Sequence, residues 1–136
     1  MKLIPEFILY VSSQAKSRDF YSALLGKQPV LDVEGMTEFL LDENTKLGLM
    51  PEEGIKKILT GITDPSSGRG IPRCELYLLT EDAEELCKNA VSSGAAEISP
   101  LLGRNWGDRT AYYADPDGHI IAIAELNNKH SPYGIL

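Results

Sequence analysis

The sequence predicts an α+β fold built from two tandem βαβββ modules, and two observations carry this prediction. In each half of the chain, an alternating strand that begins with a glutamate precedes an amphipathic helix that ends at a glycine. Gly26 lies 20 residues after Glu6, and Gly94 lies 19 residues after Glu75. Near the end of the chain, Asp115-Pro116-Asp117-Gly118 has the residues of a tight hairpin turn between two apolar strands. The 136 residues are therefore expected to form a single duplicated domain.

Residues 1–50 are expected to form the first module. Its opening strand, residues 6–11, places Glu6, Ile8 and Tyr10 on one face, because side chains alternate along a strand. A short helix follows, with apolar residues at helical spacing and a stop at Gly26. Three further strands are expected near residues 29–33, 36–42 and 45–50.

Residues 51–72 are rich in glycine and proline and are expected to be a linker, with room for one helical turn around Ile55, Ile58 and Leu59. The second module then covers residues 73–126, and residues 127–136 are expected to be a polar tail.

The second module repeats the pattern of the first. Its strand at residues 75–79 places Glu75 and Tyr77 on one face, in the register of Glu6 and Ile8. A helix follows over the apolar positions Ala83, Leu86, Cys87, Ala90 and Val91. Strands at residues 110–114 and 120–126 flank the hairpin turn.

The composition excludes some classes of function. The net charge is −7, and the lysines and arginines are scattered, which argues against nucleic-acid binding. No apolar run is long enough to span a membrane, and the amino terminus lacks a signal-peptide pattern, so a cytoplasmic protein is expected. Cys74 and Cys87 have no metal-binding or redox spacing and are expected to be reduced, buried thiols.

Several short motifs, in order along the chain, resemble those of one superfamily. The segment 7–13, the run Ser17-Arg18-Asp19-Phe20-Tyr21 and Leu24-Leu25-Gly26 are similar to its opening signature; Trp106–Arg109 and Asp115–His119 are similar to its closing one. The chain thus resembles the vicinal oxygen chelate superfamily, which includes glyoxalases, bleomycin-resistance proteins and extradiol dioxygenases. The resemblance implies a cupped eight-stranded mixed sheet, a small-molecule ligand in its concave cavity, frequently a divalent metal, and a homodimer.

The resemblance also implies where metal ligands would stand, on the first and last strand of each module. These positions match Glu6 and Gly48 in the first module and Glu75 and Ala122 in the second. Gly48 and Ala122 have no donor atoms, so no transition-metal site is expected, and the two glutamates would hold at most a weak, hydrated Mg²⁺ or Mn²⁺. His119 and His130 match no ligand position and are expected to be exposed.

Other residues are candidates for ligand binding, each with an alternative. Gly48 and Ala122 either leave room for a ligand or accommodate larger neighbours. Trp106 either stacks on a planar or cationic ligand or packs in the core. Arg109 either binds an anionic group or pairs with Asp108 or Glu125. Tyr10 and Tyr77 share the faces of the glutamates and are expected to donate hydrogen bonds into the cavity.

The paired glutamates remain the least explained feature. Two like charges in one partly dry cavity are expected to raise at least one carboxyl pKa, unless both stay solvated or pair with Arg69, Arg73 or Arg104. Glu6→Gln or Glu75→Gln is then expected to impair ligand binding and leave the fold intact.

Three functions follow from these residues and the resemblance. The first is a metal-free binding protein of the bleomycin-resistance type, which the missing ligands favour. The second is a metal-dependent lyase, isomerase or dioxygenase of the glyoxalase type, and the third is a protein-association module with a vestigial cavity.

Overall fold

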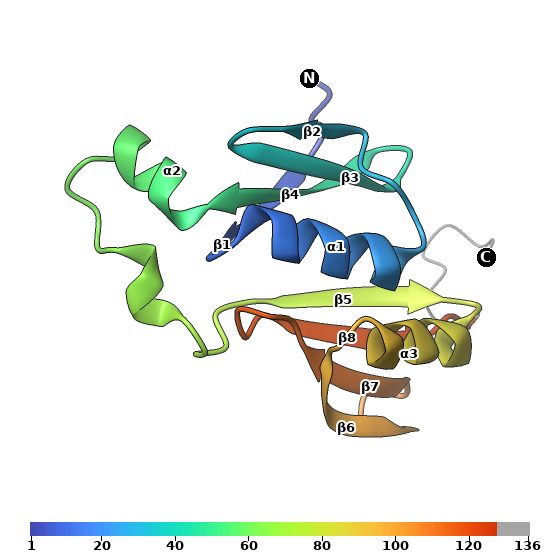
Figure 1. Ribbon diagram of the computed structural model, residues 1–136. Coiled ribbons are helices and arrows are strands. Elements are labelled where there is room, and N and C mark those ends of the chain that lie inside the picture. Colours follow the sequence, from blue (N-terminus) through green and yellow to red (C-terminus); the bar gives the residue numbers. More distant parts are fainter. Residues whose placement is uncertain (128–136) are drawn as a thin grey trace. The chain divides into compact units, whose positions relative to one another are not determined.

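The computed structural model describes residues 1–127 and confirms an α+β fold with two βαβββ modules (Figure 1). The chain divides into two compact units, one covering Met1–Arg69 and the other beginning at Gly70. His130 and nearly all of the expected polar tail lie outside the described residues. Within residues 1–127, no helix is long and apolar enough to cross a membrane.

Module one has the expected order of one strand, one helix and three strands. Its elements are β1 (Glu6–Val11), α1 (Gln14–Leu25), β2 (Leu31–Val33), β3 (Met36–Asp42) and β4 (Thr45–Pro51). The sheet order is β1-β4-β3-β2, with β1 parallel to β4 and the other pairs antiparallel. The strand expected at residues 29–33 begins at Leu31, and the one expected at 45–50 continues to Pro51.

Helix α1 covers one face of this sheet. The opposite face, which α1 does not cover, is called the open face below. Ser13 caps the helix by accepting a hydrogen bond from the Lys16 amide at 3.2 Å, and Gly26 ends it with a left-handed φ of 64°. The core between helix and sheet consists of buried apolar residues: Leu9, Val11, Phe20, Tyr21, Leu24, Phe39, Leu47 and Leu49. By strand alternation, Glu6, Ile8 and Tyr10 lie on the opposite, open face.

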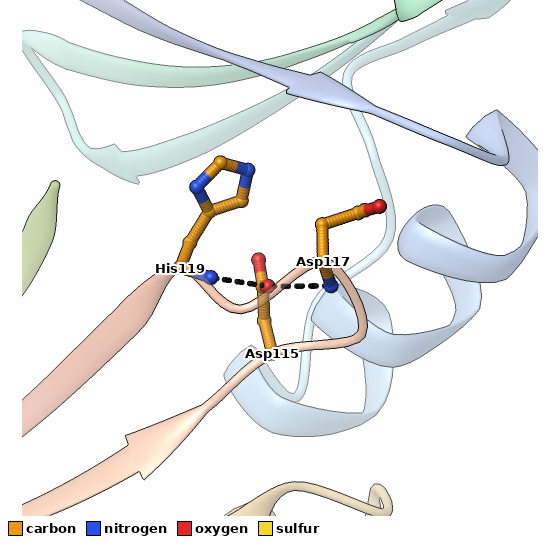
Figure 2. Close-up of side chains that lie close together, drawn as sticks. All are labelled: Asp115, Asp117 and His119. Carbon is orange, nitrogen blue, oxygen red and sulfur yellow. Dashed lines mark hydrogen bonds between the residues drawn. The ribbon is translucent and has the colours of Figure 1, made fainter. Parts of the chain in front are cut away.

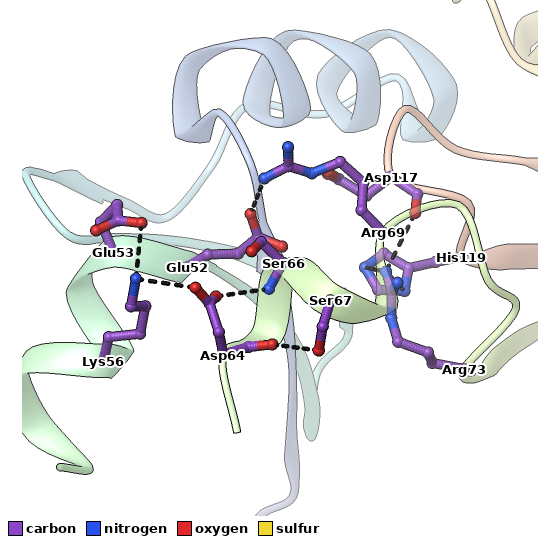
Figure 3. A network of polar contacts seen from close by, with 10 residues as sticks. All are labelled: Glu52, Glu53, Lys56, Asp64, Ser66, Ser67, Arg69, Arg73, Asp117 and His119. Carbon is purple, nitrogen blue, oxygen red and sulfur yellow. Dashed lines mark hydrogen bonds and ion pairs between the residues drawn. The ribbon is translucent and has the colours of Figure 1, made fainter. Parts of the chain in front are cut away.

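The expected linker is largely structured. Helix α2 (Glu52–Ile58) begins directly after β4, and a short 3-10 helix, η1 (Pro65–Gly68), follows. Polar contacts within this segment hold α2 and η1 together (Figure 3): Lys56 donates to Glu53 at 3.3 Å and to Asp64 at 3.1 Å, and Arg69 donates to the buried Glu52. Hydrogen bonds from Ser66 and Lys56 lower the pKa of Asp64 to about 2.

Module two repeats the topology of module one. Its elements are β5 (Glu75–Thr80), α3 (Ala83–Ser92), β6 (Ala96–Gly103), β7 (Arg109–Ala114) and β8 (Ile120–Glu125). The sheet order is β5-β8-β7-β6, with β5 parallel to β8. Strand β6 was not placed from the sequence, because Pro100 interrupts its pattern and its pairing with β7 shifts register twice.

The pairing register confirms that the two modules are duplicates at the level of single positions. Ile8 of β1 stands opposite Gly48 of β4, and Tyr77 of β5 stands opposite Ala122 of β8. Gly48 and Ala122 are thus equivalent positions, as the sequence predicts. Each module contributes a four-stranded mixed sheet, which together account for the eight expected strands.

Candidate functional site

The open face of the module-one sheet carries a group of three charged side chains: Glu6 from β1, Glu38 from β3 and Lys46 from β4. Glu6 stands opposite Lys46, and Glu38 stands opposite Gly48, so strand alternation directs all three to the same face. Lys46 Nζ lies 3.3 Å from Glu38 Oε1, and the Glu38 side chain is only 15% exposed. This ion pair is therefore partly sheltered from water.

The Glu6 carboxyl group is the unusual member of this group. Its Oε2 atom is buried, and no described residue donates a hydrogen bond to it. Burial raises the pKa of Glu6, and the adjacent Glu38 raises it further through a side-chain hydrogen bond and its negative charge, while Lys46 opposes the change. The sequence analysis expected a raised carboxyl pKa from the pairing of Glu6 with Glu75. The causes found for Glu6 are burial and Glu38, and the pairing with Glu75 stays a prediction.

Gly48 provides the space in which this carboxyl lies. A Cβ atom at position 48 would stand 2.5 Å from Glu6 Oε2 and 3.1 Å from Ile8 Cγ1. Of the two roles considered for Gly48, accommodation of a larger neighbour has this direct geometric support. Tyr10 lies half-buried on the same face of β1.

The equivalent face of module two carries a different group, centred on the Tyr77 hydroxyl. This hydroxyl donates to the Asp108 carboxylate, accepts from Trp106 Nε1 at 3.0 Å, and lies 3.1 Å from Thr110 Oγ1. A phenol has a single proton, so Thr110 is the donor in the last contact. Tyr77 therefore uses its proton on Asp108, which is 1% exposed, and holds the indole of Trp106.

Trp106 is 45% exposed, although its Nε1 atom is hydrogen-bonded within the module. Core packing, the alternative to ligand stacking for Trp106, does not fit a side chain that is this exposed. Ala122 is fully buried, opposite Tyr77 on one side and Tyr112 on the other. In the sheet it therefore lies between two residues with larger side chains.

Tyr112 continues this face and carries a cation on its ring. The Arg104 guanidinium lies 5.1 Å from the ring centroid and donates to the Thr110 carbonyl at 2.8 Å. Burial raises the pKa of Tyr112, followed by the negative charge of Glu75. Glu75 itself is exposed at the start of β5.

Arg109 does not join this group. It donates to Glu125 at 2.9 Å, and both side chains are well exposed, at 50% and 36%. Strand alternation directs Arg109 away from the face that carries Thr110 and Tyr112. Of the partners considered for it, Glu125 is the one observed.

Comparison with known proteins now places the fold in a family. Residues 4–127 match the description "Glyoxalase-like domain". The chain belongs to this family. The match covers both modules, and it supports the assignment to the vicinal oxygen chelate superfamily that the sequence motifs indicate.

Three known proteins are similar to this chain over most of its length. "Uncharacterized protein YraH" of Bacillus subtilis (strain 168) is 28% identical over 129 residues, which cover 93% of this chain and 99% of that protein. A glyoxalase-related enzyme from Fulvimarina pelagi is 21% identical with a TM-score of 0.76, over 93% of this chain and 89% of that chain. A member of the glyoxalase/bleomycin resistance protein/dioxygenase superfamily from Sphaerobacter thermophilus is 22% identical with a TM-score of 0.70, over 93% and 98%.

The superfamily implies a divalent metal, and the residues at the four matching positions do not fit one. Gly48 and Ala122 offer no donor atom, which leaves Glu6 and Glu75. Within module one, the Glu6 carboxyl lies against Glu38, whose charge is already paired with Lys46. A transition-metal ion prefers imidazole or thiolate ligands, and neither stands at these positions.

A second group of metal-type side chains, Asp115, Asp117 and His119, lies at the hairpin turn (Figure 2). All three are buried, and one ligand atom from each lies within 4.8 Å of the others. Asp115 Oδ1 accepts hydrogen bonds from the amides of Asp117 and His119, both at 2.9 Å, which fixes the turn. Arg73 Nη2 lies 3.2 Å from His119 Nε2 and donates to the Asp117 carbonyl at 3.1 Å. With a guanidinium against the imidazole, the group stabilises the turn and does not resemble a cation site.

Two expectations about buried and exposed side chains were wrong. His119 is 4% exposed, because it directly precedes β8, is held by the turn and lies against Arg73. Cys74 is exposed and Cys87 is half-buried, although both are free thiols as expected. Neither the place of Cys74 just before β5 nor the helical spacing of Cys87 in α3 determines how deeply the side chain is buried.

Proposed function

We propose that this glyoxalase-like protein binds a small molecule without a catalytic metal, and that the Trp106 ring is part of the binding surface. The main supporting observation is that the Trp106 side chain is 45% exposed while its indole N–H is hydrogen-bonded to Tyr77. An aromatic ring held in place loses little conformational entropy when a ligand stacks on it.

The support beneath the ring is itself buried and polar. Tyr77 donates to Asp108, and Thr110 completes the hydrogen bonds of the phenol oxygen. Such a network fixes the orientation of the indole, because each group in it has its partner. Arg104 and Tyr112 add a cation and a second aromatic ring to the same module. These groups favour a planar ligand with polar substituents.

The metal-dependent alternative, a lyase, isomerase or dioxygenase, requires donors that the chain lacks at Gly48 and Ala122. The relatives whose names include glyoxalase or dioxygenase share the fold at about one-fifth identity, which carries no reaction over to this chain. Ligand binding remains the function that the observed side chains support best.

The binding proposal is tested by fluorescence, since Trp106 is the single tryptophan of the chain. The probes are proflavine, a planar cation, and bleomycin, chosen because solved relatives are called bleomycin resistance proteins. We expect saturable quenching in the unchanged chain. Calorimetric titration with the same probes, which needs no tryptophan, should show weaker binding for Trp106→Phe and none for Trp106→Ala, with both variants folded by circular dichroism. No quenching by either probe, and no molecule co-purifying with the chain, would count against the proposal.

We also propose a homodimer. Large apolar side chains are exposed in both modules, among them Phe7 at 59%, Val33 at 52% and Ile98 at 57%. Light scattering at micromolar concentration should give twice the mass of the chain, and a monomer mass would remove this proposal.

A further inference from the structure

The loop between β6 and β7 carries two side chains that lie on the same face of module two. Trp106 donates to the Tyr77 hydroxyl, and the Arg104 guanidinium stands over the Tyr112 ring. Tyr77 and Tyr112 stand opposite Ala122 from its two neighbouring strands, so the two tyrosines form one row across the sheet. The proposed stacking uses Trp106 and leaves the role of Arg104 open.

Hydrogen bonds within the module hold this loop in one conformation. The Arg104 amide donates to the Asp108 carbonyl at 2.7 Å, and the Gly107 amide donates to the Arg104 carbonyl at 3.0 Å. Gly107 has a φ of 98°, a conformation that favours glycine. The buried Asp108 side chain fastens the loop to Tyr77. The loop is therefore positioned before a ligand binds, which lowers the cost of binding.

Neutral oxygens fix the guanidinium of Arg104. Its Nε and Nη2 atoms donate to the Thr110 carbonyl at 3.1 and 2.8 Å. Nη2 also lies within donating distance of Ser99 Oγ at 2.8 Å and the Pro100 carbonyl at 3.0 Å. Its Nη1 atom donates to no acceptor within residues 1–127. The side chain is thus held at one edge, while the other edge keeps free donors.

The charge of Arg104 has no fixed partner, in contrast to that of Arg109 on the same hairpin. Arg109 lies 2.9 Å from the Glu125 carboxylate, whereas no carboxylate of the described chain lies within 4.0 Å of the Arg104 guanidinium. Glu75 is near enough to raise, after burial, the pKa of Tyr112, but it is exposed, and solvent screens its charge. Arg104 is therefore a fixed cation without a fixed counter-charge.

We propose that Arg104 binds the anionic group of a planar ligand whose ring stacks on Trp106, so that the chain selects aromatic carboxylates. This inference rests on the proposed function, because the ring of the ligand needs the Trp106 surface. The free Nη1 atom supplies a charge-assisted hydrogen bond to the anion. The Tyr112 ring meanwhile keeps the guanidinium in place.

The geometry favours a carboxylate over a phosphate. Only one nitrogen of the Arg104 guanidinium is free, which suits a group with a single negative charge. A phosphate monoester carries close to two negative charges at neutral pH and would also meet the charge of Glu75. Tyr77 and Tyr112, which support Trp106 and Arg104, stand two strands apart, at about 10 Å. That separation is about the length of a two-ring aromatic carboxylate.

The test is calorimetric titration of the full chain with two probes that differ in charge. The probes are 2-naphthoate, an aromatic carboxylate, and 2-naphthamide, its neutral amide with the same rings. At neutral pH, naphthoate should bind about tenfold more tightly than naphthamide, the gain expected when one hydrogen bond joins two charged groups. Equal affinities for the two probes would overturn the inference.

Substitutions of Arg104 separate ligand recognition from support of the loop. The measured quantity is the ratio of the two affinities, because a purely structural role lowers both affinities and leaves their ratio unchanged. Arg104→Gln should bring the ratio close to one. Arg104→Lys should keep part of the preference, since the ammonium retains the charge but not the planar geometry. A preference for naphthoate that survives in Arg104→Gln would overturn the inference.

Arg109→Gln is the matched control. It removes the same charge from the same hairpin, but strand alternation directs this side chain away from Tyr112. The preference for naphthoate should persist in Arg109→Gln. A preference lost equally in both glutamine variants would reflect the net charge of the chain and would contradict a specific role for Arg104.

The inference and the proposed function fail in different ways. If naphthamide and proflavine bind but naphthoate has no advantage, the stacking surface stands and only the role of Arg104 is wrong. If neither naphthyl probe nor proflavine binds, the stacking surface itself is wrong, and the inference falls with it.

Discussion

The two modules share one backbone plan and differ in the chemistry of their open faces. In module one, the first strand begins with the half-buried Glu6, whose Oε2 atom is buried next to Gly48. In module two, the corresponding Glu75 is exposed, and the polar centre stands two residues later, at Tyr77. Ile8, the equivalent of Tyr77 by register, is apolar. The two modules therefore have equivalent backbone positions, but the main polar side chain stands at a different position in each.

This difference follows from what the last strand of each module offers. Gly48 leaves space for the Glu6 carboxyl, whereas Ala122 is fully buried with a tyrosine opposite it on each neighbouring strand. Module one thus carries an acid pair with a lysine, and module two carries an aromatic surface on a buried hydrogen-bond network. The contrast can be tested by changing one side chain at a time.

The largest effect is expected at Asp108, which is 1% exposed and accepts from Tyr77. Asp108→Ala should cost about 2–3 kcal/mol of unfolding free energy, because it removes a charged acceptor and leaves the Tyr77 hydroxyl without its partner. The measurement is urea unfolding, with Asp108→Asn as the control that keeps an acceptor and should lose less. A loss for Asp108→Ala no greater than that for Glu6→Ala would contradict the contrast drawn between the modules.

A smaller effect is expected for Tyr77→Phe, about 1–2 kcal/mol, since the exposed indole can exchange its partner for water while the buried Asp108 loses one donor. The more informative result is the fluorescence of Trp106, which should shift to longer wavelength and lose anisotropy as the ring becomes free to move. An unchanged spectrum and anisotropy would mean that Tyr77 does not hold the ring, and the stacking surface would lose its support.

Gly48→Ala tests whether the Glu6 carboxyl occupies the space above Gly48 in module one. The new methyl group meets Glu6 Oε2, the end of a flexible side chain, and Ile8, so a cost of about 1 kcal/mol is expected. In a Glu6→Ala background the same substitution should cost less, which a double-mutant cycle measures. Gly103→Ala is the matched control, because no atom lies within 4 Å of a Cβ there. Identical costs in both backgrounds would show that the carboxyl does not occupy this space.

The smallest effect is expected at Arg109, whose ion pair with Glu125 is exposed. Arg109→Ala should change the unfolding free energy by less than about 0.5 kcal/mol and should leave proflavine quenching of Trp106 unchanged. A loss of quenching would show that Arg109 is part of the binding surface, which is one of the two roles that the sequence allows.

Much of the fold could be predicted from the sequence, because the same pattern of strand and helix occurs in both halves of the chain. The glutamate-to-glycine spacing, the alternation of β1 and β5, and the hairpin turn are local patterns, and each has a local physical cause. The equivalence of Gly48 and Ala122 follows from the same repeat and is visible in the strand pairing. The one strand that was not placed, β6, is the one whose pairing shifts register twice.

The partners within each face could not be predicted in the same way. Glu38 meets Glu6 through the pairing of β3 with β4, and that register contains an irregularity between Leu40 and Asp42. Asp108 lies in a loop, where the sequence does not distinguish a buried acceptor from an exposed acid. His119 was expected to be exposed for the same reason, since its burial depends on Arg73, a residue far away in the sequence.

Metal stoichiometry tests the central claim, ligand binding without a chelated metal, most directly. The full chain, purified without a metal-affinity tag and dialysed, is analysed by elemental analysis and native mass spectrometry. We expect far less than stoichiometric transition metal, together with the mass of the chain alone or of the chain with a small organic molecule. Stoichiometric zinc, nickel or iron that is lost in Glu6→Gln or Glu75→Gln would contradict the account and favour a metal-dependent enzyme.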